Sequence, residues 1–196
     1  MEKKSLSIKL IVDTAVRLTE ERGYGNFSVR ELAQELQVKA ASLYNHIDSI
    51  KTVNCEVAKA ASAEMSRTLS EVVLNKKRDE ALTALSYAFR QFIKDHYELY
   101  QAILALPQLD QSNGDDLRQI GRDSMQAIRN VLRQYRISAQ NVIHLGRILR
   151  SELQGFTLFE VAGYFSIPDC PSELSFKFLV KQFISMLHQL ENNSSD

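Results

Sequence analysis

The sequence predicts an all-α protein in which a small three-helix head precedes a larger helical body. Apolar residues recur at helical spacing along almost the whole chain, and no stretch shows the apolar–polar alternation of a strand. Only 7 glycines and 3 prolines occur among 196 residues, so turns are few and helices can be long. We expect the head to span residues 1–52 and the body residues 53–196.

The first predicted helix spans residues 6–22. It ends where Gly23 and Gly25 follow, because glycine readily adopts the left-handed backbone that closes helices. An apolar face must pack against another element, so this helix cannot stand alone. That face carries four apolar residues at helical spacing: Ile8, Ile11, Ala15 and Leu18.

Two short helices follow, the first opening at Ser28 and the second covering residues 39–47. Ser28 is a natural N-cap, and Glu31 three residues later completes a capping box. Gln37 and Val38 interrupt the apolar pattern between the two helices. Helices this short are not stable alone in water, so they must pack on each other and on a third element. The pattern favours a helix-turn-helix, whose second helix enters the DNA major groove.

The outward face of the second helix supports this interpretation. It offers a cation, a small apolar side chain and several hydrogen-bonding groups, which are the groups that contact base edges. No acidic residue occurs from residue 36 to residue 47, where a carboxylate would face phosphates. The alternative is a helical hairpin whose polar face meets water or a protein partner. The candidate residues are Lys39, Ala40, Ser42, Tyr44, Asn45 and His46.

A larger pattern surrounds the two short helices: a long helix, a glycine turn, an aromatic residue, a serine cap and a helix ending in Leu-Tyr-x-His. Its residues are Gly23, Phe27, Ser28, Leu43, Tyr44 and His46. In this order residues 8–53 resemble the DNA-binding head of TetR-type transcriptional repressors. That family usually has an aromatic residue where Ile47 stands and a phosphate-contacting lysine where Ile50 stands, with Lys51 the neighbouring candidate here.

Residues 147–165 provide a second resemblance, with Gly155 at their centre. They are similar to a C-terminal helix in one branch of these regulators that carries a Trp-x-x-x-His-Gly signature. Here Gln154 takes the histidine position and the tryptophan is absent. The two resemblances together cover both ends of the chain.

The resemblance implies a dimeric regulator that binds a palindromic double-stranded DNA operator, with each head binding one half-site. It further implies a repressor that a small-molecule effector releases. Phosphate contacts are expected from Ser28, Tyr44 and Lys51, although Tyr44 and His46 could equally pack against the backbone. The residues expected to face base edges are Arg30, Lys39, Ala40, Ser42 and Asn45.

Caps and helix breakers divide the body into further helices. Asp48 or Ser49 caps the first of them, and the basic residues 76–78 indicate a solvated loop. Asp79 caps the next helix, which Pro107 stops. The expected helices cover residues 49–74, 79–106, 115–135, 138–162 and 172–190, the last two capped by Ser138 and Ser172, with a loop at 109–116.

The last two helices carry more apolar residues than one inward face needs. Two such helix pairs, one from each subunit, would form a four-helix bundle, so we expect a homodimer. Gly155 in mid-helix costs about 1 kcal/mol relative to alanine and suits a place where a neighbouring helix crosses closely. The alternative is that both helices only close a monomeric core. The expected interface residues are Leu149, Gly155, Phe156, Phe176, Phe183 and Leu187.

A pocket for the effector is expected between the helix at 79–106 and the helices at 115–135 and 138–162. Aromatic and a few polar side chains on facing helices are what a small-molecule cavity needs, although an ordinary core with buried tyrosines needs the same residues. Because charged candidates are few, the effector should be mostly apolar. The candidate lining residues are His96, Tyr97, Tyr100, Met125 and His144.

Composition and motifs argue against several other classes of protein. The formal net charge is +0, which does not suit a protein that coats nucleic acid by bulk charge. The 2 cysteines have no ligand spacing, and no catalytic, cofactor-binding or metal-binding motif occurs, so we expect no enzyme activity, cofactor or metal. No apolar run reaches the roughly 20 residues of a membrane span, so a cytoplasmic protein is expected. The rival functions are an all-α ligand-binding or adaptor protein and an enzyme in a helical body.

Overall fold

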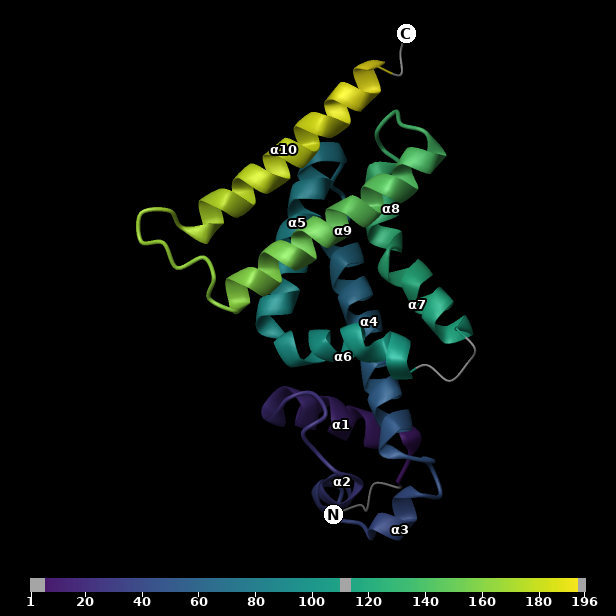
Figure 1. Cartoon of the computed structure of the whole chain (residues 1–196). Coiled ribbons are helices and arrows are strands. Elements are labelled where there is room, and N and C mark those ends of the chain that lie inside the picture. The colour runs from purple at the N-terminus through teal and green to yellow at the C-terminus, as the bar shows by residue number, and fades with distance from the viewer. Residues whose placement is uncertain (1–5, 110–113, 194–196) are drawn as a thin grey trace. The chain divides into compact units, whose positions relative to one another are not determined.

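A computed structural model describes residues 6–109 and 114–193 of the chain. Within these ranges it contains ten helices and no strand, which confirms the all-α prediction (Figure 1). None of the helices in the described ranges is both long and apolar enough to cross a membrane. The chain divides into two compact units, residues 1–64 with 96–121 and residues 65–95 with 122–196.

The first compact unit has an apolar core that holds the short helices in place. Leu32 of α2 and Leu43 of α3 are completely buried there, together with Ile11 and Leu18 of α1. Although α6 lies far downstream in the sequence, it packs against α1 in this unit. The unit contains α1 (Ile8–Arg22), α2 (Val29–Glu35), α3 (Ala40–Leu43), α6 (Tyr97–Leu109) and the first part of α4 (Ile50–Val72).

The second compact unit is built around α5, whose inward side packs against three later helices. In Figure 1, α9 and α10 run antiparallel and are joined by the loop at residues 162–171. Helix α7 (Asp115–Ser124) begins in the first unit and ends in the second. The unit contains α5 (Arg78–Asp95), α8 (Gln126–Leu132), α9 (Ala139–Val161) and α10 (Ser172–Asn193).

Three of the predicted caps are confirmed. The Ser28 hydroxyl accepts the N–H of Glu31, and the Ser138 hydroxyl accepts the N–H of Asn141 at 3.1 Å. Of the two predicted caps Asp48 and Ser49, Ser49 caps α4, because its Oγ accepts the N–H of Thr52 at 3.2 Å. These serines satisfy backbone donors that a helix start leaves unpaired.

Several predicted helix boundaries are wrong. The helix expected at 79–106 is broken at His96 into α5 and α6, and the helix expected at 115–135 is broken at Met125 into α7 and α8. The apolar spacing continues across both breaks, so periodicity alone cannot reveal them. Pro107 lies inside the last turn of α6, because a proline removes one N–H but does not prevent the next two residues from staying helical.

Three further expectations concern short segments. The second helix of the helix-turn-helix is regular only over Ala40–Leu43, and turns replace it up to His46. Arg78, expected in a solvated loop, opens α5 and pairs with Glu191. The loop expected at 109–116 falls partly on residues 110–113, which lie outside the described residues.

Candidate nucleic-acid interface

The turn between α2 and α3 is closed by a Schellman motif. The Val38 N–H donates to the Ala33 carbonyl and the Gln37 N–H donates to the Gln34 carbonyl, each at 3.0 Å. Gln37 has a φ of 55°, the left-handed conformation that usually falls to glycine at this position. The expected turn is therefore present, but it is made by a glutamine, for which the left-handed conformation is unfavourable.

The hydroxyl and the backbone N–H of Ser28 are both engaged in the capping box that begins α2. Its hydroxyl donates to Glu31 Oε2 at 2.7 Å, and its backbone N–H donates to the same oxygen at 2.8 Å. These bonds lower the pKa of the Glu31 carboxyl. Because the hydroxyl proton is already donated within the capping box, a phosphate contact by Ser28 would require that box to open.

The carboxylates of α2 are neutralised by arginines of α1. Glu35 accepts from Arg17 at 2.7 Å and from Arg22 at 2.8 Å, and Glu31 lies 3.4 Å from Arg22. Hydrogen bonding by Arg17 lowers the pKa of the Glu35 carboxyl, with a smaller contribution from Arg22. Ion pairs this exposed contribute little stability, but they compensate the negative charge near the predicted DNA-facing residues.

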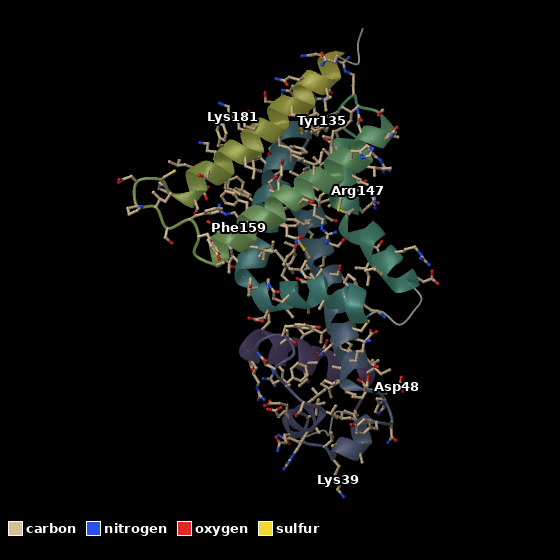
Figure 2. The ribbon with its side chains drawn as sticks, in the orientation of Figure 1. Lys39, Asp48, Tyr135, Arg147, Phe159 and Lys181 are labelled. Atoms are coloured by element: carbon tan, nitrogen blue, oxygen red, sulfur yellow. The ribbon has the colours of Figure 1, made fainter. Side chains whose placement is uncertain are left out.

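The residues on and after α3 are presented to solvent. Lys39 extends away from the end of the unit (Figure 2). The Tyr44 side chain is 57% exposed, which favours a free phenol over a packed ring. Asn45 and His46 are also exposed, whereas Ala40 and Ser42 are half-buried. Arg30 on α2 and Lys51 at the start of α4 are exposed as well, so the predicted cations are accessible.

Two contacts between α1 and the start of α6 were not expected from the sequence. The Tyr24 N–H donates to Glu98 Oε2 at 2.8 Å, and His96 Nδ1 lies 2.6 Å from Glu20 Oε1. Both join the C-terminal end of α1 to residues at the break between α5 and α6. No local sequence signal announces them, because the partners are more than seventy positions apart.

The five candidate effector residues are distributed over both compact units. His96, Tyr97 and Tyr100 belong to the first unit, where Tyr100 is completely buried. Met125 and His144 belong to the second, where His144 is exposed. None of these five residues lines the surface hollow between α9 and α10 or the one where α8 meets the start of α9.

The predicted interface residues divide into core and surface. Leu149, Phe176 and Leu187 are 0% exposed within their own chain, because they form the inward stripe of α9 and α10. They cannot offer surface to another subunit without unpacking this core. Gly155 and Phe156 instead line a surface hollow, and the nearly buried Phe183 contributes to it as well.

This hollow lies between α9 and α10 and has a volume of about 560 Å³. Two of its lining residues are exposed phenylalanines, Phe159 at 54% and Phe178 at 63% exposure (Figure 2 labels Phe159). Among the described residues, a Cβ added at Gly155 would meet nothing within 4 Å, so no described helix crosses closely there. The close approach occurs at Gly146, where an added Cβ would lie 3.2 Å from Met125 Cε.

An ion network around the buried Arg90 fixes both ends of the loop that joins α9 and α10. Arg90 of α5 donates through Nε to Glu160 of α9 at 2.7 Å, and it also donates to Glu173 of α10. Its guanidinium lies 4.6 Å from the ring centre of Phe176. Arg90 lowers the pKa of the Glu160 carboxyl to about 2, aided by a hydrogen bond from the Ser172 hydroxyl. The sequence signal for this network was the position of Arg90, a charged residue directly after the apolar Phe89.

Comparison with known families gives two matches. Residues 11–50 match the model described as "Bacterial regulatory proteins, tetR family". Residues 82–183, more than half of the chain, match the model described as "Tetracyclin repressor-like, C-terminal domain". The first match covers the helix-turn-helix and the second covers most of the α5–α10 region.

Individual proteins with similar sequences are regulators. The chain is 27% identical over 192 residues to the uncharacterized HTH-type transcriptional regulator YobS of Bacillus subtilis (strain 168), covering 97% of this chain and 96% of YobS. It is 29% identical over 90 residues to IcaR of Staphylococcus aureus (strain Newman), a negative regulator of the biofilm operon icaADBC. That second match covers 46% of this chain and 47% of IcaR.

Solved structures share the fold. A protein of unknown function from Rhodococcus sp. RHA1 superposes with a TM-score of 0.80 at 15% identity, covering 97% of this chain and 100% of the other. A TetR variant from Acinetobacter baumannii AYE in complex with minocycline gives a TM-score of 0.68 at 17% identity. This match covers 95% of this chain and 99% of that one.

Proposed function

The chain belongs to the TetR family of DNA-binding transcriptional regulators, and we propose that it is a homodimeric repressor released from a palindromic operator by a small, mostly apolar molecule. The observation that carries the DNA-reading part is the exposed, acid-free surface of α3 and its following turn. The family match disfavours the adaptor alternative. Repression is supported by the similarity to IcaR, which is a negative regulator.

Within the head, we assign two kinds of DNA contact. Asn45, Ser42 and Arg30 would hydrogen-bond to base edges, since asparagine and arginine suit adenine and guanine respectively. Lys51 and Tyr44 would contact phosphates, which position the head without reading sequence. Lys39, Ala40 and His46 remain candidates on the same surface, and Ser28 stays one only if its capping box opens.

The experiment compares Asn45→Ala with Lys51→Ala on the operator and on random DNA at several salt concentrations. Asn45→Ala should lose about 1–3 kcal/mol of discrimination between the two DNAs. Lys51→Ala should weaken both complexes alike and lower the salt slope by about one. Lys77→Ala, an exposed cation of the second unit, is the control and should change neither. Equal losses on both DNAs for Asn45→Ala would contradict base reading.

We place the homodimer interface on the outward side of α9 and α10. The support is the hollow between these helices, the exposed Phe159 and Phe178 that line it, and the uncrowded Gly155. Two such apolar surfaces would cover each other in a four-helix bundle. Exposed phenylalanines of this kind are costly in water and typical of interaction sites.

Sedimentation tests this interface with variants that spare the core. Phe178→Asp and Gly155→Leu should give folded monomers that bind a half-site only weakly. Ile143→Asp is a matched control, because Ile143 is 49% exposed on α9 but does not line the hollow. Dimers that persist in both variants would place the interface elsewhere. Phe183→Asp is unsuitable, since Phe183 is only 3% exposed and a charge there would unfold the unit.

The last part of the proposal concerns release of the operator by an effector. It draws on the fold shared with a TetR variant that was solved with minocycline. The residues to test are still His96, Tyr97, Tyr100, Met125 and His144. An effector must bind the DNA-free state more tightly than the DNA-bound state, because equal affinity shifts nothing. A compound that raises the melting temperature without releasing operator DNA would therefore not be the effector.

A further inference from the structure

A second surface hollow lies where α8 meets the start of α9. Its volume is about 550 Å³, which falls in the range of roughly 300–1,000 Å³ typical of small-molecule sites. It lies entirely within the second compact unit. The lining residues are Gln126, Arg129, Arg133, Ile137, Ala139, Val142 and Ile143.

The two walls of this hollow differ in chemistry. Gln126, Arg129 and Arg133 recur three and four positions apart, so they share one face of α8 and its C-terminal end. The opposite wall is aliphatic and consists of Val142 and Ile143 of α9 and of Ile137 before it. Among the lining residues that the structure describes, none is aromatic or acidic.

The two arginines of the cationic wall, Arg129 and Arg133, make different contacts within the described residues. Throughout the ranges that the structure describes, no carboxylate pairs with Arg133, although the arginines at 17, 22, 67, 78 and 90 each have one. Arg129 donates to Gln126 Oε1 at 3.2 Å, which holds its guanidinium along the same wall. A guanidinium is planar and binds a carboxylate through two parallel hydrogen bonds.

We propose that this hollow binds an aliphatic monocarboxylate, with the carboxylate on Arg133 and Arg129 and the hydrocarbon chain against Ile137, Val142 and Ile143. The charge of the wall selects an anion. The aliphatic side selects an apolar body, and the absence of aromatic side chains disfavours a nucleobase, which would be stacked on one. A polyanion would leave the aliphatic wall uncovered.

This site is separate from the surfaces assigned above. It uses Val142 and Ile143 near the start of α9, whereas the hollow of the proposed dimer interface uses Ser151 to Phe159 near its end. It contains no residue of the DNA-binding head. Carboxylate binding there depends neither on dimerisation nor on operator recognition, so its failure would leave the proposed function intact.

Titration calorimetry of the full-length protein with sodium octanoate tests the proposal. Octanoate should bind, and 1-octanol, which has the same chain without the charge, should bind at least about tenfold more weakly. Arg133→Gln should raise the dissociation constant of octanoate about tenfold, and Arg129→Gln should raise it as well. Ile143→Asp should abolish binding, because it places a carboxylate on the aliphatic wall.

Two controls separate this site from other binding modes. Arg147→Gln removes an exposed arginine of α9 that does not line the hollow, and it should leave octanoate affinity unchanged. Phe178→Asp alters the other hollow and should also have no effect. No octanoate binding, equal binding of octanol, equal effects of Arg133→Gln and Arg147→Gln, or loss of binding in Phe178→Asp would each overturn the proposal. Unchanged melting temperatures of the arginine variants confirm that they remain folded.

Discussion

Replacing Arg90 by methionine should lower the free energy of unfolding by about 3 kcal/mol. The side chains of Arg90 and Glu160 are only 8% and 10% exposed, and removing one partner of a buried pair costs roughly 3–5 kcal/mol. The pKa of Glu160 gives a similar magnitude. Its fall from 4.5 to about 2 corresponds to about 3 kcal/mol in favour of the ionised carboxylate at neutral pH.

The same pair predicts the direction of a pH effect. A carboxyl whose pKa is lower in the folded state stabilises the fold above its unfolded pKa, and this contribution disappears as the pH falls towards its folded pKa. For Glu160 the window runs from about pH 5 down to about pH 2. The difference in stability between the wild type and Arg90→Met should therefore be full at neutral pH and should narrow across this window.

Urea unfolding at a fixed protein concentration provides the assay, with Glu160→Gln and the double variant completing a cycle. The coupling energy between Arg90 and Glu160 should reach about 2 kcal/mol. Arg67→Met is the control, because Arg67 and its partner Glu71 are both 56% exposed and their pair should contribute under about 0.5 kcal/mol. Arg90→Met costing no more than Arg67→Met would refute the argument.

Three further outcomes follow from single positions. Gln37→Gly should raise the free energy of unfolding by about 0.5–1 kcal/mol, because glycine adopts the left-handed conformation without strain. Gln34→Gly within α2 is the control and should lower the free energy of unfolding by about 0.5–1 kcal/mol, as chemical denaturation of both variants would show. Gly146→Val should cost about 1–3 kcal/mol by overpacking against α8, as thermal unfolding would show, and a neutral result would mean that the two helices can separate freely. Glu98→Ala removes the acceptor of the Tyr24 N–H, so hydrogen exchange at that amide should accelerate, and an unchanged rate would argue against this bond in solution.

Local signals allowed the sequence to predict most helix starts and the helix-turn-helix. Serine caps depend on neighbours within three residues, so Ser28, Ser49 and Ser138 could be identified without tertiary information. The breaks at His96 and Met125 could not, because an apolar stripe keeps its period while the packing partner changes. Packing partners are a property of the fold and not of a short window.

The candidate site shows the same limit. The outward face predicted for the second helix is exposed at Tyr44, Asn45 and His46, although the sequence left open whether Tyr44 and His46 pack against the backbone. The sequence could not divide the apolar residues of α9 and α10 into core and surface. Leu149 and Phe178 look equally suited to an interface, yet one is completely buried and the other is 63% exposed.

The packing of α6 against α1 also bears on how the protein is made. The first compact unit is discontinuous in sequence, since it combines residues 1–64 with residues 96–121. The second of these segments can join the first only after the intervening residues have been synthesised. A chain leaves the ribosome N-terminal end first, so all the predicted base-contacting residues emerge well before α6 does. Until then Glu20 lacks His96 and the Tyr24 N–H lacks Glu98. A nascent chain that has not reached Leu109 thus carries every side chain predicted to contact bases on a head whose first helix is still incompletely covered.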